Sequence, residues 1–225
     1  IQRAIIQSGG GLGGIISTDS LQNAEEKGKA MWSMSGCTTL EQMRNCPADR
    51  FQEIMMNYMK QQKTFSGLPY GPCVDGQLLE QSVYEVAQQN KELDIPYMIG
   101  YTSEDIAPDR MKQAAVDWSL LLERQGRMPA YVYCFSRDLP GEDMPDPKGG
   151  FGAMKGAFHS SELWYMFCTL DKCWRPMEAA DYELSDRMVS YWTNFAKTGN
   201  PNGDDLPEWK PCTQANTYIQ DLNVK

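Results

Sequence analysis

The sequence is poor in histidine and in basic residues. Among its 225 residues there is one histidine, His159. A zinc site built from several imidazoles is therefore excluded, and any acid–base chemistry by imidazole must fall on His159. The 21 Lys and Arg residues are outnumbered by 30 Asp and Glu residues, which gives a formal net charge of −9 at pH 7. This acidic balance argues against a nucleic-acid-binding surface and against attraction to anionic membranes.

Long apolar runs and a leader pattern are also missing. No run approaches the roughly 18 apolar residues of a membrane-spanning helix, so we expect no membrane span. Residues 1–6 lack the basic, apolar and small-residue order of a signal peptide, and the first residue is not Met. We therefore interpret the sequence as a piece of a longer chain, with the N-terminal targeting region absent from it.

The seven cysteines include no C-x-x-C pair, and their number is odd. This usage fits buried small hydrophobic residues in a reducing compartment better than a disulfide scaffold, which favours a cytoplasmic location. A bridge between Cys168 and Cys173 remains open for an exported protein. A metal site at this pair is disfavoured, because no second pair of soft ligands accompanies it.

The hydrophobic pattern predicts an α/β fold. With 41% hydrophobic and 23% charged residues, the chain is long enough to bury the core of one or two domains. We expect a capping box of Asp19 and Gln22 at the start of the first helix, and helix ends at Gly36 and Gly199. Because strands and helices alternate, the sheet should be mostly parallel and flanked by helices. The patterns predict strands at 4–8, 96–101 and 130–135, and helices at 19–36, 49–62, 108–124 and 181–197.

A glycine run at residues 9–14 contains G-x-G-x-x-G after the first predicted strand. In a dinucleotide site the phosphate lies at the N-terminus of a helix that opens directly from this loop. Here residues 15–18 separate the run from the next predicted helix. We therefore interpret the run as a turn and expect neither an organic cofactor nor a metal.

An acidic residue and the histidine follow successive predicted strands. Asp105 comes after the strand at 96–101, and His159 comes after the strand at 130–135. In α/β-hydrolases a serine, an acid and a histidine occur in this order, at the carboxyl ends of sheet strands. The histidine takes the serine proton, and the carboxylate fixes the orientation of its ring. From the pattern alone, a lone acid and a lone histidine are more often structural.

Five stretches resemble the type-B carboxylesterase/cholinesterase family. Residues 3–9 look like the segment that follows the family's nucleophile elbow, and residues 71–76 are similar to its G-P-V-V-D-G motif, with Cys73 as a departure. Residues 96–105 and 156–162 resemble the segments that bear the triad acid and histidine, and residues 192–202 resemble a signature near the C-terminus. The resemblance implies that residues 1–225 are the C-terminal part of an α/β-hydrolase fold, an incomplete domain, from a serine hydrolase of carboxylic esters.

The resemblance also implies roles for individual residues. His159 would be the general base and acid, and Asp105 the orienting carboxylate. The family motif usually reads D-E-G with a catalytic Glu, whereas residues 104–106 read E-D-I, so Glu104 remains an alternative acid. Ser8 and Glu162 match positions of a buried polar network behind the triad, although both residue types are also common as ordinary caps and surface groups.

Neither a G-x-S-x-G nucleophile elbow nor an H-G-G-G oxyanion segment occurs in the sequence. We therefore expect the chain alone to be inactive, with the serine supplied by the missing N-terminal half of the same protein. One alternative is a cholinesterase-like binding or adhesion module without catalysis. A further expectation concerns the isolated piece, whose exposed sheet edge and apolar face would favour self-association.

Overall fold

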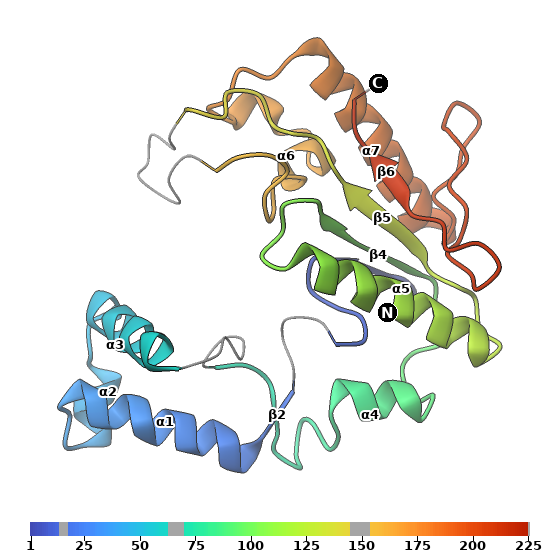
Figure 1. The fold of residues 1–225 in the computed structure, drawn as a ribbon. Helices are drawn as coiled ribbons and strands as arrows, with labels where there is room; N and C mark the ends of the chain where they lie inside the picture. The colour runs from blue at the N-terminus through green and yellow to red at the C-terminus, as the bar shows by residue number, and fades with distance from the viewer. Residues whose placement is uncertain (14–17, 63–69, 145–153, 225) are drawn as a thin grey trace. The chain divides into compact units, whose positions relative to one another are not determined.

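A four-stranded parallel sheet is the framework of the larger of two units in the chain (Figure 1). The computed structural model describes residues 1–13, 18–62, 70–144 and 154–224. One unit comprises Ile1–Ile15 with Glu92–Lys225, and the other Ile16–Lys91. The sheet has the order β1-β4-β5-β6, with β1 at Ala4–Gln7, β4 at Tyr97–Thr102, β5 at Tyr131–Phe135 and β6 at Gln220–Leu222.

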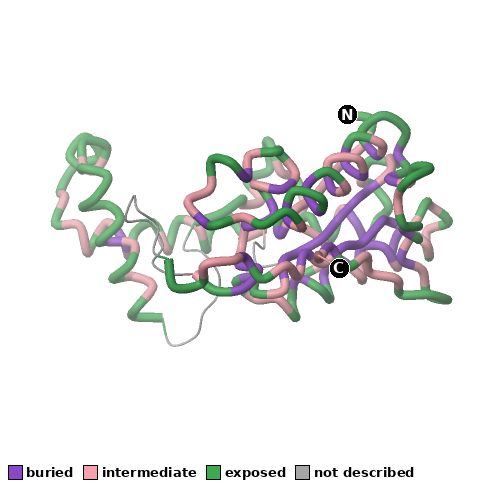
Figure 2. Tube along the Cα trace, turned by 90° about the horizontal axis from the view of Figure 1, so that it is seen from above, coloured by how far each residue is buried: buried purple, intermediate pink, exposed green. Residues whose placement is uncertain are grey.

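Helices cover the sheet on both faces. Helix α5 (Pro108–Arg124) connects β4 to β5 and packs on the face of Tyr97, whose ring meets the edge of Trp118 at 5.3 Å. Helix α7 (Ala179–Thr198) covers the other face. Side chains alternate between the two faces of a strand, so Tyr131, Tyr133 and Phe135 all point toward α7. The expected parallel sheet flanked by helices is confirmed, and buried residues concentrate along these elements (Figure 2).

Trp209 fills the centre of the core between β5 and α7. It is fully buried, its ring meets Tyr191 edge-on at 5.2 Å, and its indole N–H donates to the carbonyl of Val132 at 3.1 Å. The hydrogen bond satisfies the one polar atom of a large apolar side chain. Burial of Trp209 therefore attaches the C-terminal segment to the middle of the sheet.

Glycine at position 100 makes room for a tyrosine on the neighbouring strand. Gly100 of β4 pairs with Tyr133 of β5 on one side and with Gln7 of β1 on the other. A Cβ atom on Gly100 would lie 2.3 Å from the ring of Tyr133. The ring thus lies directly over the backbone of β4, on the face of the sheet that α7 covers.

The smaller unit contains a helical pair and a two-stranded sheet. The strands β2 (Asp19–Ser20) and β3 (Cys73–Val74) pair in parallel, and α1 (Leu21–Ser35) contacts α3 (Ala48–Gln61). The described residues of this unit also form two short helices, α2 at Leu40–Arg44 and α4 at Val83–Gln88.

The expected capping box at the start of α1 is wrong. Ser20 is the N-cap, and its hydroxyl accepts a hydrogen bond from the N–H of Asn23 at 3.2 Å. The Asp19 carboxylate instead accepts a bond from Lys27 at 2.6 Å, because Asp19 belongs to β2. The expected helix end is confirmed, since Gly36 has a left-handed backbone with φ 74°.

The glycine run forms a turn against α5 over the residues described, 9–13. Gly11 has φ +89°, and a Cβ there would lie 2.2 Å from the carbonyl oxygen of Ala114. The carbonyl of Gly13 accepts a hydrogen bond from Arg110 at 2.7 Å. Among the described residues, the next helix along the chain begins only at Leu21, so no described helix opens directly from the glycine run. Gly14 lies outside the described residues.

Replacing Gly100 by Ala should reduce the free energy of unfolding by about 1–3 kcal/mol, because the added methyl group overlaps the Tyr133 ring. Urea unfolding measures the change. Gly28→Ala is the matched control: the site is inside α1 with no heavy atom near the added Cβ, and Ala should stabilise the helix by up to about 1 kcal/mol. Equal stability of Gly100→Ala and the wild type would contradict the packing described.

Candidate active site

A single backbone bridge brings Asp105 and His159 together. The Glu104 N–H donates to the carbonyl of Ala157 at 3.0 Å, and Glu104 forms an isolated parallel bridge with Phe158. The next residue on each side of the bridge is a member of the acid–histidine pair. His159 Nδ1 lies 2.8 Å from Asp105 Oδ1.

The Asp105 carboxylate is fully buried and held by backbone donors. Its Oδ2 accepts from the N–H of Thr102 at 3.2 Å, and its Oδ1 accepts from the N–H of Ile106 at 2.9 Å. Burial raises the pKa of Asp105, but the nearby Ser8 hydroxyl, these N–H groups and His159 lower it by more, so the pKa lies below its ordinary value. Asp105 is therefore ionised near neutral pH.

The histidine ring is bound at one nitrogen and open at the other side. Because an ionised carboxylate can only accept hydrogen bonds, the Nδ1 atom of neutral His159 carries the proton that it shares with Asp105. Nε2 then bears the free lone pair. The side chain is 38% exposed, while that of Asp105 is 0% exposed. The imidazole of His159 is thus a partly exposed base that a buried carboxylate holds at its other nitrogen.

Glu104 takes part in the site through its main chain. The main chain of Glu104 forms the bridge to the histidine segment, while Glu104 as a whole is exposed to solvent. Its Cγ packs against Gly156, where an added Cβ would lie 2.7 Å away and φ is +63°. The carboxylate that contacts the histidine ring is that of Asp105.

Ser8 and Glu162 lie behind this pair. Ser8 is buried directly after β1, and its N–H donates to Gly100 at 2.8 Å. Its hydroxyl lowers the pKa of Asp105, although among the described residues no hydrogen bond joins the two. Glu162 is 1% exposed and accepts a bond from the Gln7 carboxamide at 3.2 Å.

Glu162 has the opposite electrostatic character to Asp105. Burial raises the pKa of Glu162, the charge of Asp105 raises it further, and the hydrogen bond from Gln7 does not offset the rise. Its Oε2 atom has no hydrogen-bond partner among the described residues. Burial also raises the pKa of Tyr133 well above its ordinary value, with a further contribution from Glu162. The sequence analysis did not identify Gln7 and Tyr133 as part of the site. Both residues pair with Gly100 across the sheet, and this pairing is visible only in the structure.

Two residues next to the site have left-handed backbones without being glycine. Ser8 has φ 50°, and Ser160, which follows His159, has φ 71°. Such conformations cost on the order of 1–3 kcal/mol each and persist where the surrounding contacts fix them. The chain therefore turns sharply immediately after β1 and immediately after the histidine.

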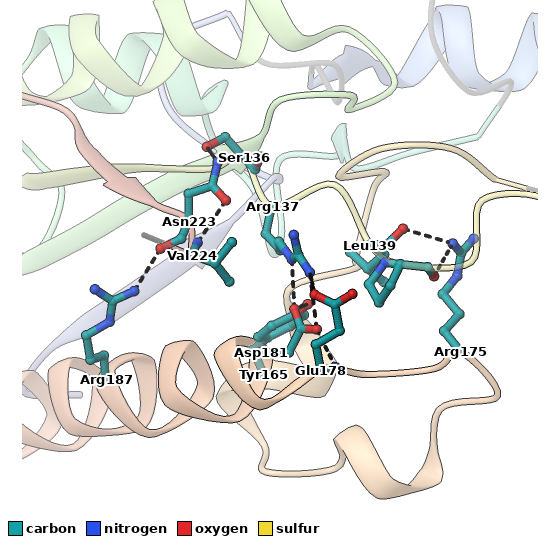
Figure 3. Close-up of polar contacts among 11 residues, drawn as sticks. Ser136, Arg137, Leu139, Tyr165, Arg175, Glu178, Asp181, Arg187, Asn223 and Val224 are labelled. Carbon is teal, nitrogen blue, oxygen red and sulfur yellow. Dashed lines mark hydrogen bonds and ion pairs between the residues drawn. The ribbon is translucent and has the colours of Figure 1, made fainter.

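A buried ion pair anchors both flanks of the histidine segment to α7 (Figure 3). Arg137, which follows β5, donates from Nε to Asp181 at 2.8 Å, and the hydroxyl of Tyr165 in α6 (Leu163–Met166) donates to the same carboxylate at 2.7 Å. Asp181 is fully buried. Burial raises its pKa, but Arg137 and the other donors lower it by more. No sequence pattern pointed to this cluster.

The sequence matches a known protein family. A model of the carboxylesterase family matches residues 1–117 and 107–225. The chain belongs to the carboxylesterase family. It is 36% identical over 107 residues to carboxylesterase 5A of Canis lupus familiaris, covering 45% of this chain and 18% of that protein. It is 32% identical over 138 residues to bile salt-activated lipase of Rattus norvegicus, covering 60% of this chain and 19% of that protein.

Solved structures agree on the fold. A structure titled thermophylic PNB esterase superposes with a TM-score of 0.73 at 18% identity, covering 99% of this chain and 54% of that chain. A PNB esterase gives a TM-score of 0.71 at 19% identity with the same coverage. The expected family and α/β-hydrolase fold are thereby confirmed. The chain spans about half the length of these structures, and the matched segments span less than a fifth of the two curated relatives.

The described residues also bear on a metal site, a disulfide and a membrane span. Within them, no group of three or more His, Cys, Asp or Glu side chains is arranged to hold a metal ion. Cys168 carries a free thiol, so no disulfide joins it to Cys173. None of the helices in the described ranges is both long and apolar enough to cross a membrane.

Replacing Glu162 by Gln should change how stability depends on pH. The folded state holds the Glu162 proton more tightly than the unfolded state, so this residue's contribution is fully present below the unfolded pKa of about 4.3 and is lost as pH rises through the folded pKa. The wild type should therefore lose stability relative to Glu162→Gln over that window.

Urea unfolding at a series of pH values measures this difference. Each unit by which the pKa is raised corresponds to about 1.4 kcal/mol. Asp105→Asn is the contrast, because the pKa of Asp105 is lowered and the stability that its carboxylate contributes is lost as pH falls rather than as pH rises. A pH-independent difference between wild type and Glu162→Gln would contradict the raised pKa.

Proposed function

We propose that this chain supplies the acid and the base of a serine hydrolase that acts on carboxylic esters. Asp105 is the orienting carboxylate, and His159 is the general base and acid. The observation that carries this assignment is the 2.8 Å contact between His159 Nδ1 and the buried, ionised Asp105. Family membership and the names of the similar proteins, three of which are esterases, support the substrate class.

The reaction follows from the tautomer of the histidine. A serine hydroxyl attacks the ester carbonyl carbon while Nε2 of His159 takes its proton, and Asp105 stabilises the imidazolium that forms. The imidazolium then gives this proton to the departing alkoxide, which leaves as the alcohol and an acyl-serine remains. Water attacks the acyl group with His159 again as base, and the carboxylic acid and the serine hydroxyl are released.

The serine comes from outside residues 1–225 in this proposal. The sequence holds no G-x-S-x-G motif, and Ser8 is a buried residue whose hydroxyl influences Asp105. We therefore assign the chain to the C-terminal part of a longer α/β-hydrolase domain. Alone, it lacks the attacking atom and the oxyanion donors, whose loss removes about 3–4 kcal/mol of transition-state stabilisation, so it is inactive.

The test is hydrolysis of p-nitrophenyl acetate by the longer protein that contains this chain. His159→Ala should remove the activity above background, and Asp105→Asn should lower kcat by about 10⁴-fold, because the wrong tautomer is then favoured. Glu104→Gln should retain wild-type activity, because its carboxylate is not the one that contacts the ring.

Three outcomes would overturn the assignment. Unchanged hydrolysis by His159→Ala removes the histidine from the mechanism. A loss in Glu104→Gln that exceeds the loss in Asp105→Asn transfers the acid role to Glu104. A longer protein with no serine at its elbow and no hydrolysis of any ester would instead favour a binding module.

A further inference from the structure

Arg175 is a buried cation that no carboxylate neutralises within the described residues. It is 4% exposed, and its guanidinium donates to main-chain oxygens only. Nη1 lies 3.4 Å from the carbonyl of Leu139 and 3.2 Å from that of Pro140, and Nη2 donates to the carbonyl of Met154. Figure 3 shows the side chain reaching toward the backbone at Leu139.

Burying the Arg175 guanidinium without a carboxylate partner among the described residues costs free energy, which its other contacts must offset. Removing a guanidinium from water costs several kcal/mol, which hydrogen bonds to carbonyl dipoles and aromatic faces offset in part. The planar fork of arginine can contact several carbonyls at once, which an ammonium group does less well. Here the three carbonyls belong to two stretches of backbone that are separated in sequence.

The aromatic contacts of Arg175 lead to the histidine. Its guanidinium carbon lies 5.4 Å from the ring centroid of Phe158 and 5.7 Å from that of Trp174. Trp164 meets the edges of both rings, at 6.0 and 5.4 Å. Phe158 immediately precedes His159 and is the residue that forms the bridge to Glu104.

Arg175 thus holds the backbone that leads to His159 at several points. It bonds the start of the segment after β5 at residues 139–140, bonds Met154 further along, and stacks on Phe158. The N–H of Leu139 also lies 3.5 Å from the carbonyl of Gly156. Between Met154 and Phe158 the chain has little freedom to slide against Glu104 while these contacts remain.

We propose that Arg175 is a positioning residue for His159. By fixing Met154 and Phe158, it maintains the register of the Glu104–Phe158 bridge, and that register sets the His159–Asp105 contact. Arg175 touches neither ring nitrogen nor carboxylate of this pair. Its relevance to catalysis rests on the proposed function, but its effect on the hydrogen bond does not.

The single histidine gives a direct measurement of this effect. In a chain labelled with ¹⁵N-histidine, one imidazole contributes to the spectrum, and its Nδ1–H proton reports on the bond to Asp105. Arg175→Met retains most of the side-chain length and removes the guanidinium. The proton should then exchange with water at least about tenfold faster, as expected when a charge-assisted hydrogen bond is loosened.

Arg187→Met is the matched control. Arg187 is a half-buried arginine on α7 whose guanidinium donates to the carbonyl of Asn223 at 2.7 Å (Figure 3). The same chemical change there should leave the His159 signal as in the wild type. Arg175→Lys should give an intermediate exchange rate, because an ammonium group keeps the charge but not the planar stacking and the fork.

The outcomes separate positioning from catalysis. Wild-type exchange in a folded Arg175→Met chain would overturn the proposal, and if that variant does not fold, wild-type exchange in Arg175→Lys would do so. In the longer protein, Arg175→Met should lower kcat by up to about 10²-fold with little change in KM. The positioning role and the proposed function can fail separately. If Arg175→Met alters the His159 signal but His159→Ala in the longer protein hydrolyses the ester fully, the positioning role stands and the proposed function is wrong.

Discussion

One backbone contact determines whether the candidate site exists. Within the sheet, β4 pairs with β5 up to Thr102 and Phe135, and the N–H of Ser103 still bonds Phe135. One residue later the partner changes, and Glu104 pairs with the segment that carries the histidine. A shift of that pairing by one residue would turn His159 to the opposite side of its segment and away from Asp105. The left-handed turns, the buried ion pair and the arginine contacts all support this register.

Two buried carboxyl groups beside the histidine show that hydrogen-bond donors decide the direction in which burial leaves the pKa. Asp105 and Glu162 are both buried. Asp105 accepts two backbone N–H bonds and the histidine, while Glu162 accepts one carboxamide bond and leaves an oxygen without a described partner. The pKa is therefore lowered for the carboxyl group that contacts the ring and raised for Glu162. A second full charge behind Asp105 would compete for the imidazolium that forms during proton transfer.

Sequence patterns predicted the long elements and the order of the acid and the histidine. Helix α5 occupies Pro108–Arg124 as expected, because apolar residues recur at helical spacing over several turns. Short elements such as α6 and β6 have too few residues to show the spacing of apolar residues that identifies a helix or a strand. The contacts of Arg175 and Asp181 were inaccessible for another reason: both depend on how segments distant in sequence pack, and a lone Arg or Asp gives no local signal. The capping error at Asp19 arose because two adjacent residues both suit an N-cap and a strand pairing decided between them.

The close approach of Gly100 and Tyr133 has an evolutionary consequence. A side chain larger than that of Ala can enter position 100 only after the aromatic ring has left position 133, and loss of that ring opens a cavity beside Glu162 and Gln7. Removing a large buried aromatic side chain costs about 3–5 kcal/mol, so the intermediate sequence is strongly disfavoured. The two positions are therefore expected to change together or not at all, and substitutions near the acid–histidine pair must follow routes that avoid this step.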